Sequence, residues 1–250
     1  MKPKEILLSL EKDVELVHPQ IKEWWLNYLQ KQSERYLDTL EFMGDMDKDT
    51  RLLEIGSLPG HFTVLLKQLG YQVRGVDLDY RRAESLWRKY DITVDEVDIE
   101  TQPLPYEENR FDLVLFMELL EHLRINPVFT LRQLYRVLKP GGKIILSTPN
   151  VPPHRRFRFF LYGHSYQDDL FQELEKLETV GHMGHFRLYI LSEVKHLLES
   201  VGFKTIKYDY RGQVALSDKR IDHVMYWLHP RKQRFRSVLY YMGQKENPTK

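Results

Sequence analysis

The sequence predicts an α/β protein whose mostly parallel sheet is covered by helices on both faces. Short apolar runs alternate with one-sided helical patterns along most of the chain, which is typical of this class. The apolar run at residues 111–117 is expected of a central parallel strand that is buried on both faces. Residues 51–60 join another apolar run to a helical pattern through a turn that contains glycine, as sheets with a ligand crevice do.

The elements follow one another in a regular order. Residues 5–43 carry apolar side chains near helical spacing and predict a helical extension, which Gly44 and the charged run 45–49 end. Seven strands are then predicted at residues 52–55, 71–76, 92–97, 111–117, 143–147, 203–210 and 235–242. The alternation of strands and helices favours a parallel sheet that is covered on both faces.

The helices between these strands have recognisable starts and stops. Residues 62–69 place apolar side chains on one face and are followed by Gly70, and residues 81–90 are predicted as the next helix. Asn126 and Pro127 begin a third helix as cap and first turn. Ser192 is predicted to cap the last one, which a glycine closes.

Residues 149–189 interrupt this alternation of strands and helices with prolines, aromatic residues and histidines. A stretch of that length is too long for a simple connecting loop, and it is predicted to be a lid or substrate-recognition insert after the fifth strand. The predicted organisation is a helical cap at residues 1–46 and a second domain at residues 47–250 that carries this insert.

Composition bounds the kinds of function. The chain has 250 residues, a formal net charge of +1 and no cysteine, which excludes disulfides, thiolate metal sites and a cysteine nucleophile. No apolar run approaches the roughly 18 residues of a membrane span, and the N-terminus lacks a signal-peptide core. A soluble cytoplasmic protein is therefore expected, and a nucleic acid or a membrane would have to be bound through a local patch.

Acidic residues follow the first three strands. Glu54 precedes the glycine-bearing turn at Gly56 and Gly60, while Asp77 and Asp98 end the next two strands and would point into the same crevice. This layout predicts a nucleotide-type cofactor. A nicotinamide cofactor is disfavoured because the turn lacks the Gly-x-Gly-x-x-Gly spacing.

Six segments, in the right order and spacing, carry a resemblance to a known family. They are Leu-Glu-Ile-Gly-x-x-x-Gly at 53–60, Gly-Val-Asp-Leu-Asp at 75–79, Val-Asp-Ile-Glu at 97–100, Pro-Leu-Pro-Tyr at 103–106, the stretch 111–123 ending in Glu-Leu-Leu-Glu-His-Leu, and residues 136–150 with Lys-Pro-Gly-Gly. The chain resembles the class I S-adenosylmethionine-dependent methyltransferases over about residues 50–210. Within them it is similar to the subset that acts on sugars, polysaccharides and quinone precursors. The resemblance implies a Rossmann-like seven-stranded sheet.

The resemblance also implies roles for individual residues. Cofactor contacts are implied for Glu54, Gly56, Ser57, Gly60, Asp77, Leu78, Asp98, Ile99 and Met117. Of these, Glu54 would lie at the methionine end, Asp77 at the ribose hydroxyls and Asp98 at the adenine. The family usually has a glycine where this chain has Leu58. Leucine does not easily adopt a positive φ, so the turn is expected to be shaped differently or the side chain to face away.

Four residues are candidates for the base that removes a proton from the acceptor: Glu118, Glu121 and His122 after the fourth strand, and His185 in the insert. Structural readings are a helix-start residue for His122, a solvated helix face for Glu121 and a lid anchor for His185. Some relatives use a Glu-x-x-Glu-His set to hold a divalent metal. Here that set would be Glu118, Glu121 and His122 with His182 or His185, and metal dependence is the less favoured alternative.

The expected activity is in-line transfer of a methyl group to an oxygen of a small molecule, a glycan or a nucleotide-linked sugar. Two alternatives stay open: a metal-dependent RNA ribose methyltransferase and a non-catalytic binding module. Basic clusters at residues 154–160 and 231–236 could contact phosphate, nucleic acid or lipid headgroups, or form a solvated face. Nucleic acid is possible but not favoured, and the oligomeric state is open.

Overall fold

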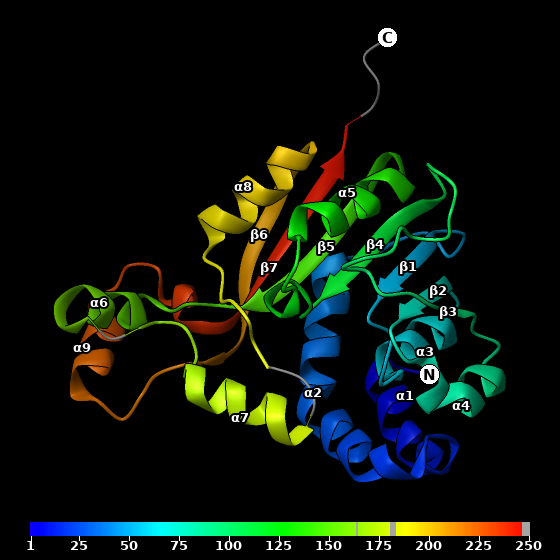
Figure 1. Cartoon of the computed structure of the whole chain (residues 1–250), viewed down its shortest axis with the longest axis horizontal. Helices are drawn as coiled ribbons and strands as arrows, with labels where there is room; N and C mark the ends of the chain where they lie inside the picture. The colour runs from blue at the N-terminus through cyan, green and yellow to red at the C-terminus, as the bar shows by residue number, and fades with distance from the viewer. Residues whose placement is uncertain (164, 181–183, 247–250) are drawn as a thin grey trace.

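The structure, a computed structural model, describes residues 1–163, 165–180 and 184–246. Its centre is a seven-stranded sheet in the order β3-β2-β1-β4-β5-β7-β6 (Figure 1). The strands are β1 (Arg51–Ile55), β2 (Gln72–Asp77), β3 (Val94–Glu96), β4 (Phe111–Met117), β5 (Leu138–Pro149), β6 (Phe203–Val214) and β7 (Arg236–Lys245). The strands from β3 to β5 pair in parallel, and β7 runs antiparallel to both β5 and β6. The predicted fold class is confirmed.

Several strand boundaries differ from the prediction. β6 and β7 run on to Val214 and Lys245, and the differences at β5 and β3 have reasons of pairing. β5 begins at Leu138 rather than at residue 143, because Leu138 pairs with Phe111 before a register shift brings Leu113 opposite Lys143. β3 is shorter than the predicted 92–97. It lies at the sheet edge against β2, and the pairing ends where Asp77 meets Glu96.

The helices include the predicted ones and three that were not predicted. They are α1 (Pro3–Ser9), α2 (Lys22–Met43), α3 (His61–Gln68), α4 (Glu84–Lys89), α5 (Pro127–Val137), α6 (Pro153–Tyr162), α7 (Leu170–Val180), α8 (Leu191–Val201) and α9 (Arg220–Leu228). Short 3-10 turns are η1 (Leu10–Leu16), η2 (Pro19–Ile21), η3 (Tyr80–Ala83), η4 (Leu120–His122) and η5 (Lys232–Phe235). Helices α6, α7 and α9 are the ones that the sequence did not predict.

The predicted helix ends are mostly correct. Asn126 caps α5 by accepting the Phe129 N–H at 3.2 Å, and Gly202 ends α8 with a φ of 112°. The predicted cap at Ser192 is wrong, because α8 begins at Leu191. Glu193 instead accepts the backbone N–H of Ile190, the residue before the helix, at 3.0 Å.

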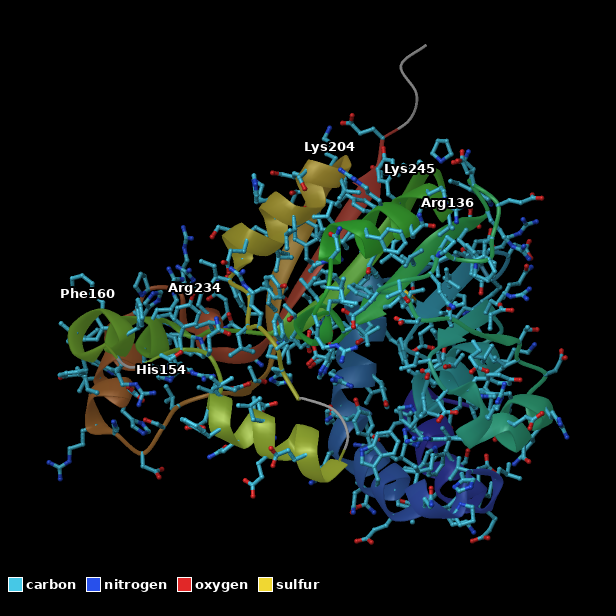
Figure 2. All side chains as sticks on the ribbon, in the orientation of Figure 1. Arg136, His154, Phe160, Lys204, Arg234 and Lys245 are labelled. Carbon is cyan, nitrogen blue, oxygen red and sulfur yellow. The ribbon has the colours of Figure 1, made fainter. Side chains whose placement is uncertain are left out.

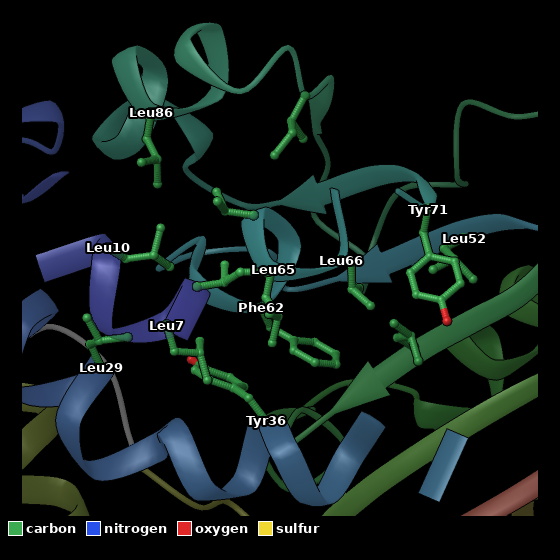
Figure 3. Packing of buried hydrophobic residues seen from close by; sticks show 14 of the residues in the cluster. Leu7, Leu10, Leu29, Tyr36, Leu52, Phe62, Leu65, Leu66, Tyr71 and Leu86 are labelled. Atoms are coloured by element: carbon green, nitrogen blue, oxygen red, sulfur yellow. The ribbon is translucent and has the colours of Figure 1, made fainter. Parts of the chain in front are cut away.

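Side chains on the two faces of the sheet enter two separate hydrophobic clusters. On one face Leu52 joins residues of α1, α2, α3 and α4, and on the other Leu53 joins residues of α5 and α8. This alternation is what a strand covered on both faces requires. Figure 3 shows the first cluster, in which Tyr36 of α2 stacks on Phe62 of α3 with ring centroids 5.3 Å apart. The N-terminal helices therefore share their core with the sheet.

The insert and the segment between β6 and β7 lie beyond one end of the sheet. In Figure 1, α6 and α9 lie at the left, with α7 below the sheet and α8 alongside β6. Over the part of the chain that the structure describes, no helix combines the length and apolar character that crossing a bilayer needs. The carboxyl ends of β1, β2 and β4 converge beside α2, and this is where the candidate site is built.

Candidate functional site

The turn after β1 is shaped by its two glycines. Gly56 has a φ of 74° and donates its N–H to the Val76 carbonyl at 2.8 Å, and Gly60, with a φ of 97°, precedes α3. Leu58 donates its N–H to Asp77 Oδ2 at 2.7 Å, and its side chain packs against the core. The positive φ angles therefore fall on glycine, and Leu58 replaces the family's glycine without adopting one.

A cavity of about 210 Å³ opens between this turn and the ends of β2 and β3. Its lining residues are Ile55, Gly56, Val76, Asp77, Leu78, Val97, Asp98, Ile99, Glu100, Leu119, His122 and Leu123. Asp77 accepts the Asp79 N–H through its other oxygen at 3.0 Å, and burial raises the pKa of its carboxyl. Asp98 accepts the Glu100 N–H at 3.0 Å. The cavity thus has apolar walls with a carboxylate at its rim.

A second, smaller cavity of about 40 Å³ lies on the other side of Gly56, which lines both. Its lining residues are Tyr28, Arg35, Tyr36, Thr39, Glu54, Gly56, Ser57, Leu58, Pro59, Gly60, Phe62 and Met117. Glu54 is buried here and accepts the Thr63 hydroxyl at 2.6 Å. Burial raises the pKa of Glu54 to about 8, with a further contribution from the negative charge of Asp77, while the Thr63 bond acts the other way.

These two adjoining cavities fit the cofactor that the resemblance implies. All nine predicted cofactor residues line one or the other, with Asp77 in the larger cavity and Glu54 in the smaller. A Cβ at Gly56 would lie 2.7 Å from Leu119 Cδ1, so any other residue would press against Leu119, which lines the larger cavity. A flat ring system suits the apolar cavity, and a cationic ammonium suits the buried carboxyl of the other.

Helix α2 supplies site residues that sequence reasoning missed. Tyr28, Arg35, Tyr36 and Thr39 all line the smaller cavity. They fall on one face of the helix because they are spaced by seven, one and three residues. An arginine and a threonine on an otherwise apolar face were the available signal, and the prediction treated this segment only as a cap.

Glu118 follows β4 in a constrained conformation. Its φ is 53°, in the left-handed region that non-glycine residues rarely adopt, and its N–H bonds to the Ser147 carbonyl at 2.9 Å. Its carboxylate accepts the Ser147 hydroxyl at 2.7 Å and pairs with Arg35 at 3.3 Å. Glu118 and Arg35 also border a hollow of about 710 Å³ between α2 and the ends of β5, β6 and β7, and Arg35 connects that hollow to the smaller cavity.

The two candidate histidines come together from distant parts of the chain. The rings of His122 in η4 and His185 in the insert are 5.2 Å apart. Nδ1 of His185 lies 2.7 Å from Asp168 Oδ2, and Nδ1 of His122 bonds to the Gly184 carbonyl. Since a carboxylate and a carbonyl only accept, Nδ1 carries the proton in each ring and Nε2 is the basic nitrogen of the neutral form.

Asp168 was not among the predicted residues. It precedes His185 by 17 positions, and its sequence context, beside Asp169 before a helix, resembles an ordinary cap. The hydrogen bond from His185 is the largest factor that lowers the pKa of Asp168, and Arg155 at 3.4 Å adds to it. Asp168 is therefore a carboxylate that orients the His185 ring.

The structure brings only some of the predicted metal ligands together. Glu121, His122 and His185 each offer a ligand atom within 4.8 Å of the others, whereas Glu118 is outside this group and His182 lies outside the described residues. Glu121 is buried and accepts the Thr148 hydroxyl at 2.9 Å, and its burial, with Glu118 nearby, raises its pKa well above the usual range. The other Glu121 oxygen, Oε1, is buried without a hydrogen-bond partner among the described residues, and a cation held by this group would require the Glu121 carboxyl to be ionised.

Comparison with known proteins identifies the family. Residues 28–208 match the model of a methyltransferase domain family. The chain is similar to ubiquinone biosynthesis O-methyltransferases: 31% identical to that of Pseudomonas aeruginosa over 46% of this chain and 51% of the relative, and 29% identical to that of Coxiella burnetii over 64% and 65%. The chain spans about half the length of the first of these curated relatives.

Solved structures share the fold at low identity. A SAM-dependent methyltransferase from Archaeoglobus fulgidus aligns with a TM-score of 0.59 at 16% identity, covering 86% of this chain and 94% of that one. Phosphoethanolamine N-methyltransferase 2 of Haemonchus contortus aligns at 0.58 and 19%, covering 86% and 53%. The cyclase SpnF aligns at 0.59 and 16%, covering 88% and 83%, so the fold alone does not specify the reaction. The match over residues 28–208, more than half of the sequence, shows that the chain belongs to the methyltransferase domain family.

Proposed function

We propose that the protein transfers a methyl group from S-adenosylmethionine to a hydroxyl oxygen of a small molecule. The observation that carries the proposal is the pair of cavities that meet at Gly56, lined by Asp77 on one side and Glu54 on the other. When bound, the cofactor supplies an electrophilic methyl group on a sulfonium. The residues of the chain then have to bind the donor, align the acceptor and remove one proton.

The donor would be held at its adenosine end by the larger, mostly apolar cavity with Asp77 at its rim, and at its amino-acid end by the buried Glu54. Asp77 would accept the ribose hydroxyls, since each of its oxygens receives one backbone N–H and has capacity for another donor. Asp98 and Ile99 would contact the adenine. Glu54 would ionise beside the amino-acid ammonium, because a cation at that position offsets the cost of burying the charge.

The base that we propose is His185, with Asp168 as its positioning residue. The Asp168 carboxylate holds Nδ1–H at 2.7 Å and leaves Nε2 as the atom that would take the hydroxyl proton. The adjacent His122 lines the larger cavity, which puts this pair of rings at the border of the donor site. His122 is the second candidate for the same role, and Glu118 is the third, although its carboxylate is engaged by Arg35 and Ser147.

The acceptor would enter the hollow that Glu118 and Arg35 border, and it would have to extend past Glu118 to bring its hydroxyl to His185, since neither histidine lines the hollow. Its volume of about 710 Å³ suits a small molecule. Its lining includes the carboxylates of Glu34, Asp38 and Glu118 and the cations of Lys31 and Arg35. This lining lacks the excess of cations that a polyanion such as RNA requires, and it suits a hydroxylated small molecule or a neutral glycan. The O-methyltransferase names of the relatives support oxygen as the atom that is methylated.

Calorimetric titration with S-adenosylmethionine and with S-adenosylhomocysteine tests the proposal. We expect both to bind, and Asp77→Ala to weaken binding about tenfold or more because a charged hydrogen-bond acceptor is lost. Asp45→Ala, which removes an exposed carboxylate away from the cavities, is the matched control. Absence of binding by both ligands would contradict the proposal. Binding without methylation of any hydroxylated compound in a broad panel would favour the non-catalytic module.

A further inference from the structure

Helices α6 and α9 form a pair beyond the end of the sheet that we call the α6–α9 lobe (residues 153–162 and 220–228). Helices in a folded domain normally bury an apolar stripe and expose their polar side chains. In this lobe the order is reversed. Of the described residues in the two helices, the buried ones are His154 in α6 and Asp222 in α9.

The inner side of the lobe is polar and ionic. Asp222 accepts the hydroxyl of Ser217, and its Oδ2 lies 3.8 Å from both His154 Nε2 and Arg158 Nη2. The His154 ring stacks on the buried Phe235 with centroids 5.7 Å apart. These contacts tie α6 and α9 to each other and to η5, the turn before β7, so polar and ionic groups help to set the orientation of the two helices.

The outer side of the lobe is apolar. Its exposed large side chains are Phe157, Phe159, Phe160, Leu161 and Tyr162 in α6, and Ile221, Val224, Trp227 and Leu228 in α9. Phe160 is 82% exposed and Trp227 73% exposed. Figure 2 shows Phe160 at the outer edge of the molecule, with His154 and Arg234 closer to the sheet. A surface of this kind is far more apolar than a solvated helix pair needs to be.

The two segments that carry these apolar side chains are also rich in cations. Residues 150–163 and 214–236 together contain nine Lys or Arg and two Asp, although the whole chain has a net charge of only +1. Arg156, Lys219, Arg220, Arg231 and Lys232 among them are exposed. The rest of the chain therefore carries net negative charge, so an anionic surface would attract the lobe and repel the remainder.

We propose that the α6–α9 lobe binds the surface of an anionic lipid bilayer, with its aromatic side chains in the headgroup region and its cations against lipid phosphates. Tryptophan, tyrosine and phenylalanine flanked by arginine and lysine are suited to that interface. A second copy of the chain is a poorer occupant, because a symmetric contact through this side would bring basic residues against basic residues. This inference goes beyond methyl transfer and does not depend on it.

Co-sedimentation of the full chain with vesicles tests the proposal. We expect binding to vesicles in which about a quarter of the lipid is phosphatidylserine, weak binding to pure phosphatidylcholine, and loss of binding as salt is raised. Brominated lipid should quench part of the tryptophan fluorescence in the wild type, and the Trp227→Ser variant should lose that quenching. Trp25 and Trp87 are buried, and Trp24, which is 43% exposed, lies in α2 outside the lobe, so these three tryptophans provide the background.

Matched pairs of substitutions distinguish a specific effect of the lobe on vesicle binding from the effect of changing any exposed apolar or basic residue. Phe160→Ser with Trp227→Ser, and Arg231→Glu with Lys232→Glu, should each reduce partition into the anionic vesicles by about tenfold or more. Leu8→Ser with Ile125→Ser, which are equally apolar and 62% exposed elsewhere, should leave it unchanged, as should Lys12→Glu with Lys204→Glu. All of these sites are exposed, so circular dichroism should report an unchanged fold.

Four results would overturn the proposal. The first is that the wild type binds neither kind of vesicle, and the second is that it binds both equally and independently of salt. The third is sedimentation of the free protein as a dimer that Phe160→Ser with Trp227→Ser dissociates, since the apolar side would then be a contact between copies of the chain. Quenching that survives Trp227→Ser would likewise place the bound lipid elsewhere.

Discussion

At the scale of single residues, Glu54 couples the site to stability. Its carboxyl has an ordinary pKa of 4.5 and a pKa of about 8 in the folded chain, chiefly because it is buried. The folded state thus binds this proton more tightly than the unfolded state does. The contribution of Glu54 to stability is greatest below about pH 4.5, is lost as pH rises, and is fully lost above about pH 8.

We therefore expect Glu54→Gln to stabilise the protein without ligand at alkaline pH. A neutral amide has no charge to bury, so the gain above about pH 8 should be on the order of a few kcal/mol and should vanish near pH 4.5. Denaturant unfolding across this range measures it, with the exposed Glu107→Gln as the control. The same variant should bind S-adenosylmethionine more weakly. A wild type whose stability is flat between these pH values would refute the assignment.

The His185–Asp168 pair makes a second prediction at this scale. Asp168→Asn keeps the size of the side chain but removes the carboxylate that holds Nδ1–H, so the ring is no longer oriented. We expect kcat to fall by roughly 10- to 100-fold with the KM for S-adenosylmethionine unchanged. His185→Gln should cost at least as much, and the double variant should be no worse than His185→Gln alone, because the two residues act as a unit.

Two controls distinguish orientation of the base from support of the insert. Arg155→Gln removes the other partner of Asp168 and should leave kcat nearly unchanged. Glu178→Gln changes an exposed carboxylate of α7 and should have no effect. If Asp168→Asn raises KM and leaves kcat intact, Asp168 supports binding and the base must be sought at His122 or Glu118.

At the scale of elements, the sequence predicted the strands and helices that follow a regular apolar pattern. It missed helices whose buried residues are polar. The strands and helices from β1 to β5 follow apolar runs and one-sided patterns, and the carboxyl ends of parallel strands necessarily meet, so Glu54, Asp77 and Asp98 could be assembled without a structure. Helices α6 and α9 escaped prediction because their buried residues, His154 and Asp222, are polar. A pattern rule that seeks an apolar inner stripe does not recognise such helices.

Contacts between elements that are distant in the sequence could not be predicted either. The roles of α2 and of Asp168 depend on which helix lies across the end of the sheet and on how the insert folds back. The ion pair of Arg35 with Glu118 joins residues 83 positions apart. Neither residue belongs to a local motif from which the other could be predicted as its partner. Packing of α2 on α3 brings them together, as the stack of Tyr36 on Phe62 shows.

At the scale of the whole molecule, the shared core predicts that ligand binding and α2 are linked. Tyr28, Arg35 and Tyr36 line the smaller cavity, while the same helix packs against α3 in the cluster around the sheet. A ligand that occupies the cavity should therefore stabilise α2 and the sheet together. At a concentration of 100 times its Kd, S-adenosylhomocysteine should add about 2.7 kcal/mol and raise Tm by roughly 5–10 °C.

Hydrogen exchange locates this stabilisation. On addition of S-adenosylhomocysteine we expect slower exchange in α2, α3 and the turn at residues 56–60, because all of them border the occupied cavities. Exchange in α6 and α9 should not change, since none of the residues that line the two cavities belongs to either helix. Asp77→Ala should abolish the shift in Tm and the protection together. Protection of the turn with unchanged exchange in α2 would show instead that the N-terminal helices are energetically independent of the donor site, despite the core that they share with the sheet.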